Sequence, residues 1–361
     1  MNNNLDSIDW DFLLNSIAQS NAVLLLGHNV LQGAQEELYA KLRDRLGGDL
    51  QHFYARDGLF LFKDGVAKTK AQQEAALLYK SKSPDEAVLK KIVQLPFRLM
   101  ISANPDQSIS AAFAKYRQRL QFDYFSSKNK EKQDVSVARP TVENPLLYNL
   151  CGSCEDQESL VLDYDDLFGM LKQLLPDLGI PDNMRGTLKK CDTYIFVGFH
   201  FERWYTQLFL RYLNMNESRF DNSKSNYVLK TVFQHDEAQR FFLEQFNVKF
   251  IGADLHFLEE LHRRFEEKFP DGMRKIVDEL SPAATAVHQL VASGDVARAL
   301  AMMNIYSTQL EEADRQVLTM TEAAHSQYLS DKASGQVLTE NLNTSLAKVR
   351  NNLLDLAAKI K

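Results

Sequence analysis

The sequence has few cysteines and no long apolar segment. Three cysteines in 361 residues are too few, and odd in number, for a disulfide-stabilised scaffold, and they are typical of a protein in the reducing cytoplasm. No run of about 18 apolar residues occurs, so we expect no membrane-spanning helix. The first residues contain no basic stretch followed by an apolar one, so we expect no secretory signal. These absences point to a cytoplasmic protein without a membrane partner.

The sequence also has fewer basic residues than acidic ones. The 42 lysines and arginines are outnumbered by 48 aspartates and glutamates, which gives a net charge of −6. Nucleic acids are bound by basic faces, so we do not expect a nucleic-acid partner. Apolar residues make up 45% of the chain and charged residues 25%, which is the usual range for globular proteins. At this length we expect two domains.

Short apolar runs alternate with helical patterns over the first two-thirds of the chain. Strands are expected over residues 22–26, 59–62, 99–102, 159–162, 194–197, 227–233 and 248–251. Helices are expected between them, for example over residues 35–46, 84–93 and 202–213. Strands that alternate with helices indicate a parallel sheet with helices on both faces. We therefore expect an α/β domain over residues 1–270.

The strand signals end after residue 272. From residue 281 onward, apolar residues recur at spacings of three and four, which predicts helices. Ser281 and Asp295 are placed to cap the first two of these helices, and Gly294 ends the first. We expect residues 281–361 to form a small all-α bundle.

Glycine and polar residues follow two of the expected strands. Gly27, His28 and Asn29 follow the first strand, where a glycine lets backbone amides approach a phosphate. A single glycine by itself favours the alternative, a tight turn from strand to helix. Gly198 and His200 follow the strand at 194–197, and Gly198 would let a ligand or a neighbouring loop pass close to the backbone. His200 could act as a general base, although a histidine among aromatic residues is more often a packing residue.

Asn104 and Asp106 follow the strand at 99–102. Open α/β sheets bind ligands at the carboxyl ends of their strands, and an asparagine there can hydrogen-bond a ribose or position a water. An Asx turn that caps the strand is the alternative.

Cys151 and Cys154 form a Cys-x-x-Cys pair around Gly152. This spacing occurs in redox and zinc sites. Cys191 is the only other cysteine, and no second pair follows, so a four-ligand zinc site is hard to build. We expect structural or unpaired thiols and no bound metal.

Taken in order, these segments resemble the sirtuin family in the divergent form found in bacterial antiphage proteins. That family has a strand followed by Gly-Ala-Gly-x-Ser, a strand ending in Thr-x-Asn-x-Asp, then Lys-Leu-His-Gly, and a strand ending in Gly before a helix. The matching segments here are residues 26–31, 101–106, 148–152 and 196–199. The resemblance implies a Rossmann-like domain that binds NAD or a related nucleotide. It implies cofactor contacts from Gly27, His28, Asn29, Gly152, Gly198 and His200.

The departures from the family pattern concern its catalysis. Asn104 and Asp106 match, but Cys151 occupies the position of the family's catalytic histidine. A thiol, with an ordinary pKa near 8.5, replaces histidine poorly as a proton acceptor at neutral pH. His28 and Leu31 add bulk where the cofactor would lie, whereas Asn29 tolerates the left-handed conformation better than most residues. The four-cysteine zinc module of protein deacylases is absent.

Two functions therefore remain open. The domain is either a pseudoenzyme that binds a nucleotide and acts as a sensor or scaffold, or an NAD-hydrolysing antiphage effector. In the second case Asn104 would position water and Asp106 would support it. A deacylase is not expected.

Residues 287–300 and 348–356 resemble the opening and the ending of an effector-associated domain. Such small helical adaptors couple effectors to sensors in bacterial conflict systems. The resemblance implies that residues 281–361 bind another defence-system protein, and we also expect the chain to form a homo-oligomer. A generic bundle that packs on the first domain or dimerises it is the alternative.

Overall fold

The computed structural model describes residues 8–126, 137–174, 181–200, 203–214, 225–229, 248–251, 256–276, 281–334 and 339–360. The chain divides into two compact units. The first unit contains Met1–Ser108 and Asp123–Arg274, and the second contains Ile109–Phe122 and Lys275–Lys361. The helical unit therefore includes a segment from inside the first half of the sequence.

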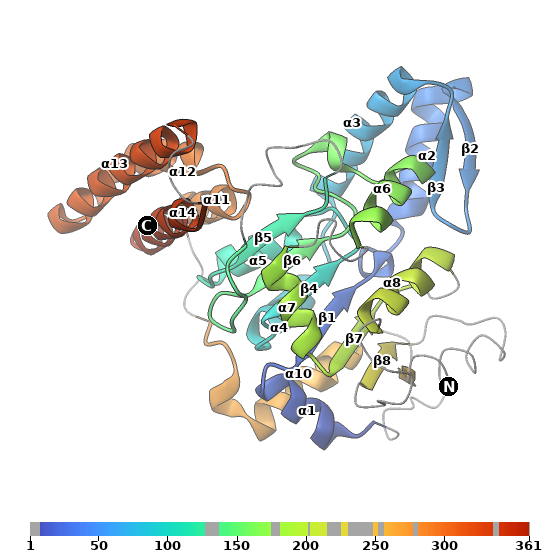
Figure 1. Cartoon of the computed structure of the whole chain (residues 1–361), viewed down its shortest axis with the longest axis horizontal. Helices are drawn as coiled ribbons and strands as arrows, with labels where there is room; N and C mark the ends of the chain where they lie inside the picture. The colour runs from blue at the N-terminus through green and yellow to red at the C-terminus, as the bar shows by residue number, and fades with distance from the viewer. Residues whose placement is uncertain are drawn as a thin grey trace. The chain divides into compact units, whose positions relative to one another are not determined.

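The first unit is built on a seven-stranded sheet with the order β5-β6-β4-β1-β7-β8-β9. The strands are β1 (Ala22–Leu26), β4 (Leu99–Ser102), β5 (Gln121–Tyr124), β6 (Leu146–Asn149), β7 (Thr193–Val197), β8 (Ser225–Leu229) and β9 (Val248–Ile251). Every pairing from β6 through β9 is parallel. The expected Rossmann-like α/β class is confirmed (Figure 1).

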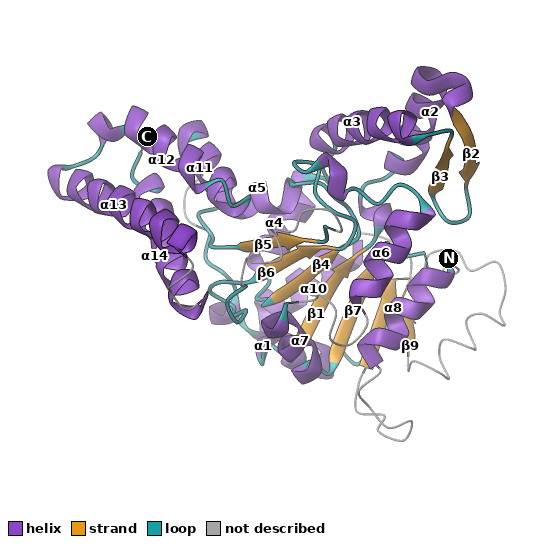
Figure 2. Ribbon diagram, turned by 45° about the horizontal axis from the view of Figure 1, so that its top comes forward, coloured by secondary structure: helices purple, strands orange, loops and turns teal. Residues whose placement is uncertain are grey.

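The central strand β1 is buried along its whole length, as its unbroken apolar sequence predicts. Val23 and Leu25 belong to a core that includes α6 (Tyr164–Leu174), α7 (Asp182–Lys190) and α8 (Trp204–Asn214). Because side chains alternate along a strand, Leu24 and Leu26 point to the other face. Figure 2 shows α6, α7 and α8 in front of the sheet, so helices cover this face as expected.

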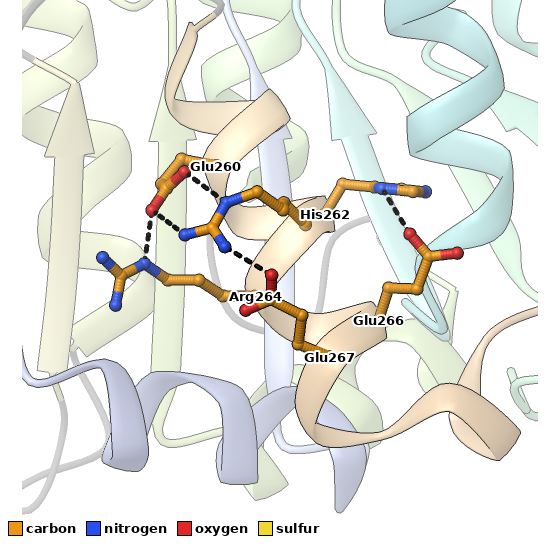
Figure 3. Close-up of polar contacts among 6 residues, drawn as sticks. Glu260, His262, Arg264, Glu266 and Glu267 are labelled. Atoms are coloured by element: carbon orange, nitrogen blue, oxygen red, sulfur yellow. Dashed lines mark hydrogen bonds and ion pairs between the residues drawn. The ribbon is translucent and has the colours of Figure 1, made fainter.

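The helices α1 (Trp10–Ala18), α4 (Glu86–Gln94) and α10 (His256–Lys268) pack together. Trp10 stacks on Phe257 of α10 with ring centroids 5.9 Å apart. The exposed side of α10 carries a network of ion pairs in which Glu260 binds both Arg263 and Arg264 (Figure 3). The side chains of Arg263 and Glu267 on this side of the helix are solvent-exposed. Ion pairs between exposed side chains contribute at most about 1 kcal/mol each.

A small lobe lies beyond the carboxyl ends of the parallel strands (Figure 1). It consists of α2 (Ala34–Leu46), β2 (Leu50–Tyr54), β3 (Leu59–Phe62) and α3 (Gly65–Ser81). The strand expected at 59–62 is confirmed, but it pairs antiparallel with β2 in a separate sheet. Stacked rings form the centre of this lobe, with Phe53 4.4 Å from Tyr39 and 4.9 Å from Phe60 between centroids.

Two expected elements differ from the structure. The helix expected from residue 84 begins at Glu86, because the Asp85 carboxylate accepts a 2.7 Å hydrogen bond from the Ala87 amide and caps the helix there. The strand expected at 159–162 is wrong. The hydroxyl of Ser159 bonds the amide of Ser153 and the carbonyl of Asp156, and these local bonds hold the chain in a compact turn. Part of the strand expected at 227–233 lies outside the described residues.

The second unit contains all of α5 (Ser108–Lys115) but its first residue, together with α11 (Pro282–Ala292), α12 (Val296–Ile305), α13 (Glu312–Ser334) and α14 (Thr339–Ala357). Ser281 and Asp295 cap α11 and α12 as expected. The apolar stripe of α14 buries Val349, Leu353 and Leu356 in the core of this bundle. Among the described helices, none is both long and apolar enough to cross a membrane.

Candidate functional site

The carboxyl ends of β6, β4, β1 and β7 lie side by side, because these strands are parallel neighbours in the sheet. The ladder continues past the strand ends. The Ala103 amide donates to the Leu26 carbonyl, and the Leu150 amide donates to the Ser102 carbonyl, both at 2.7 Å. The segments singled out in the sequence therefore converge on one edge, the usual place for ligands in such sheets.

Asn104 links the end of β4 to the turn after β1. Its side-chain Nδ2 donates a 3.0 Å hydrogen bond to the carbonyl of Gly27, and its own amide donates to the Ser102 hydroxyl at 3.0 Å. The side chain is buried, with 2% of its surface exposed. The side-chain amide of Asn104 thus already donates a hydrogen bond to the protein backbone.

Gly27 and Gly198 bring two loops into close contact. A Cβ atom on Gly27 would lie 2.3 Å from the carbonyl oxygen of Gly198. The Gly27 amide donates to Val197, and the Asn29 amide donates to Gly198, at 2.7 and 3.1 Å. Gly198 has φ +74°, a conformation that favours glycine. The space left by the missing side chain of Gly27 is filled by protein backbone.

Two histidines follow these glycines. His200 Nε2 lies 2.8 Å from Asn29 Oδ1 and ties the two loops together. His28 is half-buried, and its Nδ1 is shielded from solvent without a hydrogen-bond partner among the described residues. Burial lowers the pKa of His28 to about 3, the charges of Arg203 and His200 lower it further, and the side chain of Asn104 opposes the shift. His28 is therefore neutral near pH 7.

The carboxylate of Asp106 is hydrogen-bonded to Ser108 at the start of α5. Its Oδ1 accepts hydrogen bonds from the amide of Ser108, at 2.9 Å, and from the Ser108 hydroxyl. Burial raises the pKa of Asp106, and these bonds from Ser108 oppose the rise. The side chain of Asn149 binds the Asp106 carbonyl at 3.1 Å.

Cys151 and Cys154 are free thiols. Burial raises the pKa of each to about 12, so both are protonated near neutral pH. Gly152 between them has φ +88°, and a Cβ atom there would lie 2.3 Å from the Ser159 carbonyl oxygen. Within the described part of the chain, no group of three or more acidic, histidine or cysteine side chains could hold a metal.

A pocket lies between the strand ends and the small lobe, with a cavity volume of about 40 Å³. A second pocket of about 30 Å³ shares His28, Ala103, Cys151, Met170 and Tyr205 with it. Neither lining includes Asn104 or Asp106. A water molecule needs roughly 10–15 Å³ of such space, so the pockets hold a few waters, and side chains must move to admit a nucleotide.

Arg203 is a site residue that the sequence analysis missed. It lines the second pocket with 4% of its surface exposed. Its Nη1 donates to the hydroxyl of Tyr205 at 2.7 Å, and its Nη2 donates to Oε1 of Gln35 at 2.8 Å. Tyr205 in turn donates to the carbonyl of Asp57 at 2.9 Å. The sequence did contain a signal for this residue, because Arg203 is a basic residue that closely follows Gly198 at the end of β7.

Two family models match parts of the chain. Residues 98–251 match the family model described as the SIR2-like domain, and residues 282–361 match that of effector-associated domain 11. No curated protein sequence is significantly similar. One similar solved structure is described as the crystal structure of a Sir2 homolog–NAD complex. It shares 12% identity, with a TM-score of 0.36 over 72% of this chain and 94% of that one. The chain thus carries a SIR2-like domain followed by an effector-associated domain 11.

Proposed function

We propose that the first domain is a sirtuin-like nucleotide-binding module of a bacterial defence system that binds its ligand without turning it over. It acts as a sensor or scaffold through the helical domain. One observation carries this proposal. The strand-end pocket is lined by Cys151 and His28, and neither side chain accepts a proton readily near neutral pH.

Hydrolysis of NAD in this family would need a base for the ribose hydroxyl. A general base works best when its pKa lies near the working pH. The pKa of Cys151, about 12, keeps the thiol protonated, and the pKa of His28, about 3, makes the imidazole a weak base. The carboxylate of Asp106 is held by Ser108 and does not line the pocket. His200, the other histidine considered as a general base, lines the second pocket, and its Nε2 lies 2.8 Å from Asn29 Oδ1, which engages this atom. The states of Cys151, His28 and Asp106 favour binding over catalysis.

Shielded polar atoms support a polar ligand such as NAD or a related nucleotide. Nδ1 of His28, Oδ1 of Asp57 and Nε of Arg203 are buried without hydrogen-bond partners in the described residues. His28 lines both pockets, Asp57 lines the first and Arg203 lines the second. Buried polar atoms are normally satisfied, so such atoms gathered around one pocket point to a ligand with both donors and acceptors.

The test uses the full-length protein and NAD. We expect calorimetry to detect binding, and chromatography to detect no release of nicotinamide. Release by the unmodified protein that Cys151→Ala abolishes, while Cys154→Ala retains it, would contradict the proposal. That result would favour the alternative of an NAD-hydrolysing effector.

The helical domain supplies the proposed link to a partner. Helix α13 buries only Leu318 and Thr321 among its described side chains, while Met320 is 71% exposed. Ile305 at the end of α12 is 73% exposed. Val317, one turn before Met320 on α13, is 38% exposed, so these two side chains mark the apolar surface that we propose binds the partner. The Met320→Glu variant should no longer co-purify with a defence protein that carries a like helical domain, whereas the Glu322→Gln variant should still do so. Light scattering of the purified protein tests the expected homo-oligomer.

A further inference from the structure

Arg203 is a buried cation with no charged partner among the residues that the structure describes. It forms no ion pair with any described residue, and its hydrogen bonds go to the neutral groups of Tyr205 and Gln35. Its Nε is shielded from solvent and makes no hydrogen bond within the described ranges. An arginine does not lose its proton in a protein, and an unpaired buried charge is costly. A guanidinium in this state is suited to an anion.

The second pocket provides a place for that anion. Besides Arg203 it is lined by His28, His200 and Cys151 together with mostly apolar side chains, and none of its described lining residues carries a carboxylate. The carboxylate of Asp57 lines the first pocket and accepts a hydrogen bond from Tyr164. The second pocket is therefore the side on which a negative charge is favoured.

The turn after β1 cannot hold a phosphate through these backbone amides. The amides of Gly27, Asn29, Val30 and Leu31 already donate to Val197, Gly198, Gly27 and His28, in that order. A phosphate at this edge of the sheet needs other donors, and side chains can supply them. Arg203 can offer its free N–H to a phosphate oxygen, and guanidinium groups fit such oxygens well.

We infer that Arg203, together with Nδ1 of His28, forms an anion subsite that binds a phosphate group of the nucleotide. This inference rests on the proposed function for the rest of the ligand. The subsite takes the place of the backbone cradle that the packed turn no longer provides.

The experiment measures binding to the full-length chain by calorimetry, and thermal unfolding with and without pyrophosphate. The ligands are ADP-ribose, adenosine and pyrophosphate, which separate the nucleoside from its phosphates. The variants are Arg203→Met and Arg203→Lys, with Arg264→Met as the matched control, because Arg264 lies on α10 and binds Glu260. Arg203→Lys keeps the charge if Arg203→Met does not fold.

We expect Arg203→Met to weaken ADP-ribose binding by at least about tenfold and to leave adenosine binding unchanged. Arg203→Lys should weaken ADP-ribose binding less, and Arg264→Met should bind as the unmodified protein does. Pyrophosphate should raise the unfolding temperature of the unmodified protein but not that of Arg203→Met.

The outcomes separate the two proposals. If ADP-ribose binds equally well to the unmodified protein and to both Arg203 variants, the anion subsite is wrong and nucleotide binding stands. If pyrophosphate stabilises the unmodified protein but neither ADP-ribose nor adenosine binds, the subsite stands and the proposed function fails. If none of the three ligands binds, both are overturned.

Discussion

Gly27 shows how one missing Cβ atom brings two loops of the site together. Its neighbour is the backbone of Gly198, which cannot rotate away as a side chain could. The same contact fixes the carbonyl of Gly27, which receives the hydrogen bond from Asn104. At the scale of single residues, the site is therefore held by backbone packing.

A Gly27→Ala substitution should lower the free energy of unfolding by about 1–3 kcal/mol, because the added methyl group overlaps the Gly198 carbonyl. Urea unfolding measures the change. Gly186→Ala in α7 is the control, since a Cβ atom there meets nothing within 4 Å, and it should stabilise by about 0.5–1 kcal/mol. Equal stability of the two variants would show that the loops separate freely.

Arg274 is a second buried arginine, with a different role from Arg203. Its guanidinium donates to the backbone carbonyls of Val93, Leu95, Phe97 and Val142. Burial lowers the pKa of Arg274 to about 10, which still leaves it charged near pH 7. Because the guanidinium nitrogens of Arg274 all donate hydrogen bonds to backbone carbonyls, this side chain stabilises the fold and is not suited to bind a ligand.

Arg274→Met should therefore lower the free energy of unfolding by about 3 kcal/mol, because several buried carbonyls lose their donor. Arg263→Met on the exposed side of α10 should change it by no more than about 0.5 kcal/mol. Both values come from denaturant titration at neutral pH. A loss for Arg274→Met no larger than that for Arg263→Met would contradict the assigned role.

At the scale of elements, α11 carries a buried histidine into the helical core. His288 is 5% exposed, and its Nε2 has no partner in the part of the chain that the structure describes. Burial lowers the pKa of His288 to about 4, and a hydrogen bond with the backbone of Leu354 opposes the shift. The folded helix therefore holds His288 neutral.

This depressed pKa predicts acid sensitivity of the helical unit. As the pH falls below about 6.5, the unfolded chain binds a proton at His288 before the folded chain does. The stabilising contribution is complete above pH 6.5 and is lost progressively toward pH 4, by about 3 kcal/mol in total. Urea unfolding at pH 7 and pH 5, followed by circular dichroism, should show a smaller pH dependence in His288→Gln. An unchanged dependence would mean that His288 does not titrate on unfolding.

At the scale of the whole molecule, the chain passes from the strand-end site directly into the helical unit. Asp106 and Ser108 belong to the first unit, and Ile109–Phe122 belongs to the second. Within the second unit, Gln118 binds the carbonyl of Lys275 at 3.0 Å, and Arg119 pairs with Asp355 at 3.2 Å. The segment after β4 thus forms a covalent connection between the candidate site and the helices.

Truncation after residue 276 should therefore disturb more than the deleted helices. We expect Ile109–Phe122 to lose its contacts with residues 277–361 and to become a site of limited proteolysis, while the full-length chain is protected there. Mass spectrometry of the fragments locates the cleavage. Equal protection of this segment in both proteins would show that it folds independently of residues 281–361.

Much of the fold was predictable because it depends on local patterns. The unbroken apolar run of β1 and the caps of α11 and α12 were recognised correctly. The error at residues 159–162 arose because side-chain bonds from Ser159 hold the chain in a turn despite its apolar composition. β3 was recognised as a strand, but nothing in its four residues told which sheet it joins.

By itself, the sequence determined the alternation of strands and helices, the helical character of residues 281–361, and the order of the polar residues at the strand ends. These features follow from the spacing of neighbouring residues, which a linear pattern records. Only the tertiary structure decided that Gly198 fills the space beside Gly27, that Arg203 is buried without a counter-charge from any described residue, and that Ile109–Phe122 joins the helical unit. The physical reason is that each of these depends on contacts between residues far apart in the chain, and hydrophobic periodicity carries no information about which distant segments meet.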